Sequence, residues 1–186
     1  MKALKHKGFS TTVFIIALLT VFSIITPYKL DAIENSNWRE FKCESGKCSI
    51  AFPTIPKHMQ EQFELPKSKA KVTYDAYVSS NNPQTVFMML IANYPVAISP
   101  EYQRISLEGF INGLVQQGGQ IIFANALNIP NATGVEFFIQ NGNVYFKGKA
   151  IMKGKKLYLI AMESLDTQYK DSLYHQFIES FRFMGS

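Results

Sequence analysis

Cysteine and histidine are scarce in this 186-residue chain, which has two cysteines and three histidines. A small scaffold held together by several disulfides is therefore excluded, and the chain is long enough to bury a hydrophobic core without them. Beyond the N-terminal region the two histidines, His58 and His175, lie more than a hundred residues apart, in no metal-ligand spacing. We therefore expect no metal site and no cofactor.

A charge excess of one sign is also missing once the N-terminal region is set aside. Four of the 19 Lys and Arg residues and one of the 14 Asp and Glu residues precede residue 33, which leaves 15 basic against 13 acidic residues. A net charge of +2 excludes the strong positive field of a nucleic-acid-binding domain. With 47% hydrophobic and 18% charged residues, the chain is also too apolar to be disordered.

Recognisable catalytic motifs are absent as well. The chain has no G-x-S-x-G sequence and no phosphate-binding glycine loop, and the acids Glu101, Glu108, Glu136 and Glu163 are scattered. We therefore expect no catalytic residues and a protein that is not an enzyme. An enzyme of unrecognised type is the remaining alternative on this point.

One long hydrophobic run is present, and it lies at the N-terminus. Lysines within the first seven residues precede residues 8–28, a stretch of 21 residues without charge. A basic segment before an apolar run is typical of an export signal, and this run is also long enough to cross a bilayer. Residues 1–32 are therefore predicted to be a signal peptide or an N-terminal membrane anchor, followed by a linker at residues 33–37. Either alternative places the remainder outside the cytoplasm, in the periplasm or anchored to the inner membrane.

Residues 38–186 are predicted to form one α+β domain. A helix begins with Ser99 and Pro100, carries an apolar stripe at spacings of three and four residues, and ends at Gly118. A second helix is expected after a cap at Asp166 or Thr167. Hairpin connections require antiparallel pairing, so we expect an antiparallel sheet of about six to eight strands with two main amphipathic helices packed on it. Candidate strands are residues 38–43, 48–52, 59–65, 70–79, 85–94, 120–129, 134–140, 144–153, 156–164 and 181–183.

Two of these strands have distinctive patterns. Residues 70–79 alternate apolar with polar side chains, which predicts one buried face and one wet face that includes Asp75 and Tyr77. Residues 85–94 are almost wholly apolar, which predicts a central strand.

Four segments together resemble the PsbP/Mog-like superfamily. They are a W-x-x-F entry at Trp38, the sequence G-K-C-S-I-A-F-P-T-I-P from Gly46, the mid-chain helix ending in Gly-Gly, and a terminal F-I-E-S-F-R-F. The resemblance covers residues 38–184 and implies an α/β/α sandwich. It also implies an accessory or adaptor function, because the family includes photosystem II extrinsic subunits, Ran-binding proteins, bacterial envelope lipoproteins and secretion chaperones. The family shares no catalytic motif, and this chain lacks the lipid-acceptor cysteine of the lipoproteins.

Cys43 and Cys48 flank a turn-rich tetrapeptide and are placed at the ends of adjacent hairpin strands. In an exported chain this position predicts a structural disulfide. A redox role is the less favoured alternative, because C-x4-C is not the C-x-x-C of thiol oxidoreductases and no helix N-terminus flanks either thiol.

The function that follows is an exported or membrane-tethered, non-enzymatic accessory domain that binds another envelope protein. The main alternative is a small-ligand or lipid-binding envelope protein, with Phe87, Met89 and Phe110 lining a pocket between sheet and helix. A basic cluster around one hairpin is a candidate contact for anionic lipid headgroups, although lysines also protect hairpins against edge-to-edge association. The cluster consists of Lys147, Lys149, Lys153, Lys155 and Lys156.

Overall fold

The computed structural model describes residues 38–64, 69–115 and 118–185. The predicted signal peptide or anchor at residues 1–32 and the linker at 33–37 lie outside these ranges. Within them, no helix combines the length and hydrophobicity needed to span a membrane.

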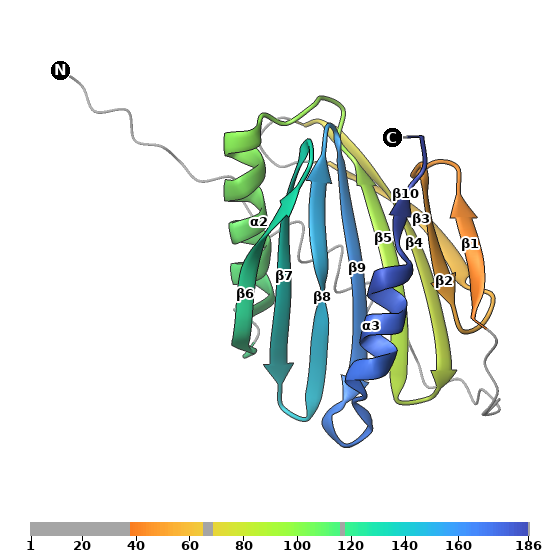
Figure 1. Ribbon diagram of the computed structural model, residues 1–186. Coiled ribbons are helices and arrows are strands. Elements are labelled where there is room, and N and C mark those ends of the chain that lie inside the picture. Colours follow the sequence, from red (N-terminus) through yellow and green to blue (C-terminus); the bar gives the residue numbers. More distant parts are fainter. Residues whose placement is uncertain (1–37, 65–68, 116–117, 186) are drawn as a thin grey trace.

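The strands of the described residues form two antiparallel sheets (Figure 1). The large sheet has seven strands in the order β3-β4-β5-β9-β8-β7-β6, and the small sheet has the order β1-β2-β10. The predicted six to eight strands in one sheet are thus corrected to ten in two, because the first hairpin pairs with the C-terminal strand and not with an edge of the large sheet. The strands are β1 (Arg39–Cys43), β2 (Cys48–Phe52), β3 (Lys57–Glu64), β4 (Lys71–Asn82), β5 (Thr85–Asn93), β6 (Gln120–Ile129), β7 (Ala132–Asn141), β8 (Val144–Lys153), β9 (Lys156–Leu165) and β10 (Arg182–Phe183).

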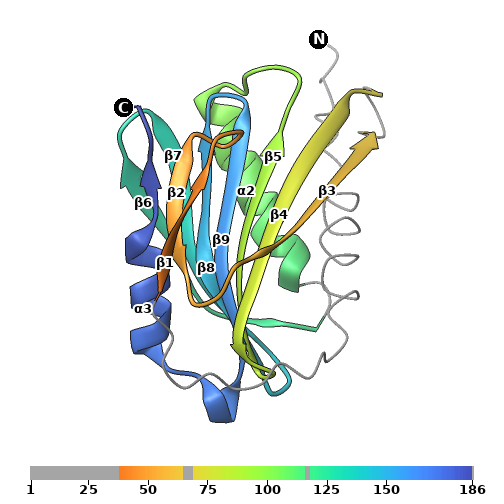
Figure 2. The ribbon, with the colours of Figure 1, turned by 90° about the vertical axis from the view of Figure 1, so that its right-hand side faces the viewer.

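The large sheet is covered on both faces, as Figures 1 and 2 show. Helix α2 (Pro100–Val115) packs on one face, mainly against β7. Helix α3 (Asp171–Ser180) lies on the other face together with the small sheet, and it contacts β2, β8 and β9. The α+β sandwich with two main helices is therefore confirmed, with a small sheet added to one layer.

Each face of the large sheet has its own hydrophobic core. On β9, Leu157 and Leu159 belong to the core under α2, whereas Tyr158 and Ile160 belong to the core under α3 and the small sheet. The predicted central strand is confirmed as β5, which lies between β4 and β9 and buries both of its faces. A strand buried on both sides must be apolar throughout, and this explains its continuous hydrophobic sequence.

The start and end signals of the first helix are confirmed, and those of the second are not. Helix α2 begins at Pro100, and Gly118 beyond its end has the left-handed φ of +94° that favours glycine. The predicted cap residue Asp166 instead opens a short 3-10 helix, η1 (Asp166–Gln168), and α3 begins at Asp171. Asp166 Oδ1 accepts a hydrogen bond from the N–H of Thr167 inside this turn, so its carboxylate caps no longer helix.

Candidate functional site

Two cysteine thiols lie beneath the turn that joins β1 and β2. Cys43 ends β1, Cys48 begins β2, and the two residues are directly opposite each other in the antiparallel register. Both are buried, with 2% and 0% of their surface exposed, and both are free thiols. The predicted placement at adjacent strand ends is therefore confirmed. The predicted disulfide is absent from this structure.

The two sulfurs have different partners. Cys43 Sγ lies 3.4 Å from Ser45 Oγ and 3.4 Å from the Tyr77 hydroxyl, whereas Cys48 Sγ lies 3.8 Å from Met89 Sδ. A hydrogen bond from the Cys48 thiol, supported by the two hydroxyls, lowers the pKa of Cys43 to about 5 although burial opposes this. The same hydrogen bond, together with burial, raises the pKa of Cys48. The pair therefore favours a thiolate at Cys43 and a protonated thiol at Cys48.

A buried carboxylate lies next to the thiol pair. Asp75 on β4 is 4% exposed, and its Oδ1 lies 2.8 Å from His58 Nε2 and accepts a hydrogen bond of 3.1 Å from Gln60 Nε2. Its Oδ2 accepts a hydrogen bond of 3.5 Å from Ser45 Oγ. The His58 ring stacks on Tyr77, with 4.6 Å between ring centroids and 10° between planes. A chain of polar contacts thus connects the thiols with the half-exposed imidazole.

Most of these polar residues were not predicted as site residues. Asp75 and Tyr77 were expected on a wet face of their strand, but the structure buries both. The alternation of residues 70–79 correctly predicts a strand with two different faces. The expectation that the polar face is exposed to solvent is wrong, because the β1–β2 hairpin packs over this face. The available signal was the aspartate itself, since a carboxylate within a strand bordered by apolar residues requires a partner when it is covered.

The turn over the thiols is closely packed and tethered. A Cβ atom at Gly46 would lie 2.4 Å from Ile91 Cδ1, 3.0 Å from Cys48 Sγ and 3.2 Å from Cys43 Sγ, so only glycine fits without displacement. Three hydrogen bonds join the turn to other elements: from the Tyr158 hydroxyl to the Gly46 carbonyl (2.8 Å), from Lys156 Nζ to the Ser45 carbonyl, and from the Met184 N–H to the Lys47 carbonyl (2.8 Å). The hairpin end is therefore a fixed cover over the sulfurs.

The three residues predicted to line one pocket are separated by the sheet. Phe87 and Met89 lie in the core under α3 and the small sheet, and both are fully buried. Phe110 on α2 lies in the core on the opposite face. The prediction of a shared pocket is corrected accordingly, because Phe87 and Met89 share one face of β5 and that face points away from α2.

The five predicted surface lysines do not form one basic surface. Lys147 is 8% exposed, and its ammonium forms an ion pair of 2.7 Å with Asp171 Oδ1. Lys153 Nζ lies 4.2 Å from the centroid of the Phe183 ring, and the Lys156 ammonium is bound to the turn over the thiols. Lys149 is partly exposed, and Lys155 is exposed at the β8–β9 turn. Lys147, Lys153 and Lys156 are therefore assigned structural roles in place of the predicted contact with lipid headgroups.

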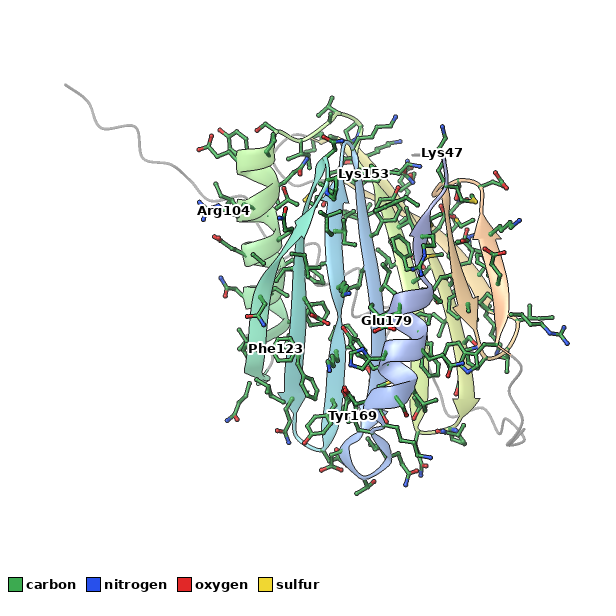
Figure 3. The ribbon with its side chains drawn as sticks, in the orientation of Figure 1. Lys47, Arg104, Phe123, Lys153, Tyr169 and Glu179 are labelled. Atoms are coloured by element: carbon green, nitrogen blue, oxygen red, sulfur yellow. The ribbon has the colours of Figure 1, made fainter. Side chains whose placement is uncertain are left out.

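Lys147 lies in an aromatic enclosure at the other end of the sheet from the thiols. Lys153 and Lys47 mark the thiol end in Figure 3, and Phe123 and Tyr169 mark the aromatic end. The Lys147 ammonium faces four rings, at centroid distances from 4.3 to 6.0 Å: those of Phe123, Phe138, Tyr169 and Tyr174. The hydrogen bonds from Lys147 and Tyr169 lower the pKa of Asp171 to about 2. This arrangement pins α3 to the large sheet.

The two edges of the large sheet differ in charge. Edge strand β3 carries Lys57, His58, Glu61 and Glu64. Edge strand β6, QIIFANALNI, has ten residues with no charge and no proline, and most of its side chains are exposed. Within the described residues its one neighbour is β7, which leaves the outward row of backbone N–H and C=O groups available for pairing. A bulge between Ile121 and Phe123 blunts this edge locally, near the start of the strand.

Comparison with known proteins supports the architecture. No protein-family model and no curated protein matches the chain. The solution structure of cyanobacterial PsbP (CyanoP) from Synechocystis sp. PCC 6803 superimposes with a TM-score of 0.50 and 10% sequence identity, over 84% of this chain and 98% of that one. The fold is PsbP-like. At this identity the likeness concerns the fold, which agrees with the resemblance in the sequence, and it transfers no site residue.

Proposed function

We propose that this PsbP-like chain is a non-enzymatic accessory domain, exported or tethered to the membrane, that binds another protein of the cell envelope. The PsbP-like fold and the sequence resemblance support an accessory role. The observation that carries the binding mode is the uncharged edge strand β6. The partner contributes an extended segment that pairs with β6 as an eighth strand.

The contrast between the edges supports β6 as the docking strand. Natural proteins protect exposed edges with charges, prolines and short strands, and β3 follows this rule with its charged side chains. Strand β6 has ten residues without either protection. Strand addition obtains affinity from backbone hydrogen bonds and specificity from alternate side chains.

The side chains of β6 favour a neutral partner segment. Ala124, Asn125 and Ala126 are small and exposed in the middle of the strand, so they allow close approach of a second backbone. Ile121 and Ile122 are 43% and 49% exposed at its start and offer an apolar contact. A charged segment gains no complementary charge here, whereas an uncharged strand with alternating apolar residues does not lose solvation of charges on pairing.

The small-ligand alternative loses its stated basis, because its three pocket residues lie on opposite faces of the sheet. The protein-binding proposal is therefore preferred.

The test is crosslinking of the full-length chain in cells, with affinity capture and mass spectrometry. Ala126→Lys places a charge in the middle of β6, and Gln62→Lys places the same charge on the exposed edge β3 as a matched control. We expect one near-stoichiometric envelope protein in the wild type and in Gln62→Lys, and at least a tenfold loss in Ala126→Lys. Equal capture by both variants would contradict docking at β6. A crosslinked species of twice the chain mass with no other protein would replace the partner by a second copy.

A further inference from the structure

The thiol pair beneath the β1–β2 turn is chemically asymmetric. Both residues belong to the same hydrophobic core, but Cys43 Sγ faces two hydroxyl groups, while Cys48 Sγ faces the thioether of Met89. The environment therefore stabilises negative charge at Cys43 and keeps the proton on Cys48. One sulfur is placed as a nucleophile, and the other is placed next to it as a resolving thiol.

Polar groups surround the sulfur of Cys43. Ser45 Oγ and the Tyr77 hydroxyl are both 3.4 Å from Cys43 Sγ, the thiol donates to the Tyr77 oxygen, and the N–H of Gly46 donates to the sulfur. Once Cys43 has lost its proton, the Tyr77 hydroxyl is able to donate to the thiolate together with the Gly46 N–H. Such donors stabilise charge that develops on an oxygen during bond cleavage.

The polar chain beyond these hydroxyls reaches solvent. It continues from Ser45 through Asp75 to His58, whose side chain is 47% exposed. The charged and titratable groups around the thiols are Asp75 and Tyr77 from β4, His58 from β3, and Lys156 and Tyr158 from β9. The site is therefore joined to bulk water by hydrogen-bonding groups although the sulfurs themselves are buried.

The β1–β2 turn over the sulfurs limits the size of an oxidant that can reach them. Cys43 and Cys48 are 2% and 0% exposed, and the turn above them is fixed at three points and has no space for even one methyl group at Gly46. A protein disulfide or an aromatic disulfide reagent cannot approach either sulfur without opening the hairpin. A peroxide is a two-oxygen molecule close to water in size and polarity, so it needs a smaller opening of the hairpin than either of these reagents.

We propose that Cys43 and Cys48 form a peroxide-reactive dithiol, in which Cys43 is the nucleophile and Cys48 resolves it. The Cys43 thiolate attacks one oxygen of hydrogen peroxide, the O–O bond breaks, and Cys43 becomes a sulfenic acid. The hydroxide that leaves takes up the proton that the Cys43 thiol had released to the solvent and becomes water. The Cys48 sulfur then attacks Cys43 Sγ and displaces the hydroxyl, which leaves as water with the Cys48 proton. Two thiols are oxidised to one disulfide, and one peroxide is reduced to two waters. This inference is independent of docking at β6.

The experiment uses the full-length chain, purified in reduced form and treated with stoichiometric hydrogen peroxide. We expect a mass loss of two hydrogens and loss of both free thiols in the wild type. In Cys48→Ser, Cys43 is expected to accumulate as a sulfenic acid that dimedone traps once the oxidised protein is unfolded, and in Cys43→Ser the rate of peroxide consumption falls at least tenfold. Ser45→Ala is expected to slow the reaction by about threefold to tenfold, while Ser106→Ala, which removes an exposed serine hydroxyl on α2, does not.

Two measurements on the wild-type protein test the proposal without a cysteine variant. When the folded wild type is treated briefly with peroxide and then unfolded in dimedone, peptide mapping is expected to place the adduct on Cys43; an adduct on Cys48 overturns the assignment. Peroxide is expected to react at least tenfold faster than an aromatic disulfide reagent of equal concentration. Equal rates for both reagents, or reaction with peroxide only in denaturant, would show that the folded site does not provide the reactivity.

Discussion

Glu163 provides a quantitative test of how the face under α2 is packed. It lies on β9 in register with Val86 of β5 and Phe146 of β8, and its side chain is partly buried. Burial raises its pKa from 4.5 to about 7. The folded protein thus holds this proton more tightly than the unfolded chain does. The resulting stabilisation is fully present below pH 4.5 and is lost as the pH rises through 7.

The magnitude follows from the two pKa values. A rise from 4.5 to about 7 corresponds to about 3 kcal/mol between the two protonation states. The side chain keeps some contact with solvent, so this figure is an upper bound. Glu163→Gln keeps the shape of the protonated acid and cannot ionise. We expect it to leave the free energy of unfolding unchanged at pH 4.5 and to raise it by up to about 3 kcal/mol at pH 8.

The measurement is urea unfolding of wild type and variant at pH 4.5, 6 and 8. Glu40→Gln is the matched control, because Glu40 is an exposed strand glutamate on β1. The control should show the same small difference from wild type at every pH. If Glu163→Gln destabilises the protein at pH 8, or if its effect does not grow with pH, the carboxylate is better solvated than the burial argument requires.

Three further changes test the packing of other elements, each by urea unfolding. Asp171→Asn removes the carboxylate from the buried Lys147 ammonium and should cost about 1–3 kcal/mol; the lowered pKa of Asp171 means that the ion pair persists as the pH falls and is lost only near pH 2. Tyr174→Phe removes the hydroxyl that donates to Glu136 Oε1 at 2.6 Å and should cost about 1.5–3 kcal/mol. Gly46→Ala overfills the space under the β1–β2 turn and should cost about 1–3 kcal/mol.

Local signals in the sequence were sufficient for most elements of this fold. Pro100 and Gly118 bound α2 because proline suits the first helical turn and glycine adopts the left-handed conformation after the last one. Strands with tight turns were also identified, including the apolar β5. The position of the β1–β2 hairpin was not predictable, because pairing with β10 depends on contacts between residues more than a hundred positions apart.

The same long-range contact explains why the thiol site was only half predicted. Cys43 and Cys48 are close in sequence, and a hairpin turn places them together. Asp75, Tyr77 and His58 come from other strands and become neighbours of the thiols only when the hairpin lies over β4. A solvent-exposed strand face and a buried polar network have the same sequence pattern. Here the β1–β2 hairpin, which covers β4, makes the difference.

The stability of the oxidised hairpin separates a reactive dithiol from a structural staple. A disulfide between Cys43 and Cys48 closes a loop of only six residues, for which loop-closure entropy predicts about 2 kcal/mol of stabilisation. Oxidation also removes the thiol proton that Cys43 donates to the Tyr77 hydroxyl and weakens its contact with Ser45 Oγ, each worth about 1 kcal/mol net. The two effects offset each other, so the unfolding free energies of the reduced and the oxidised protein should differ by less than about 2 kcal/mol in urea. If oxidation raises the free energy of unfolding by more than about 4 kcal/mol, the pair is a structural disulfide instead. The fold would then require the disulfide, and the two free thiols would not be the functional form of the hairpin.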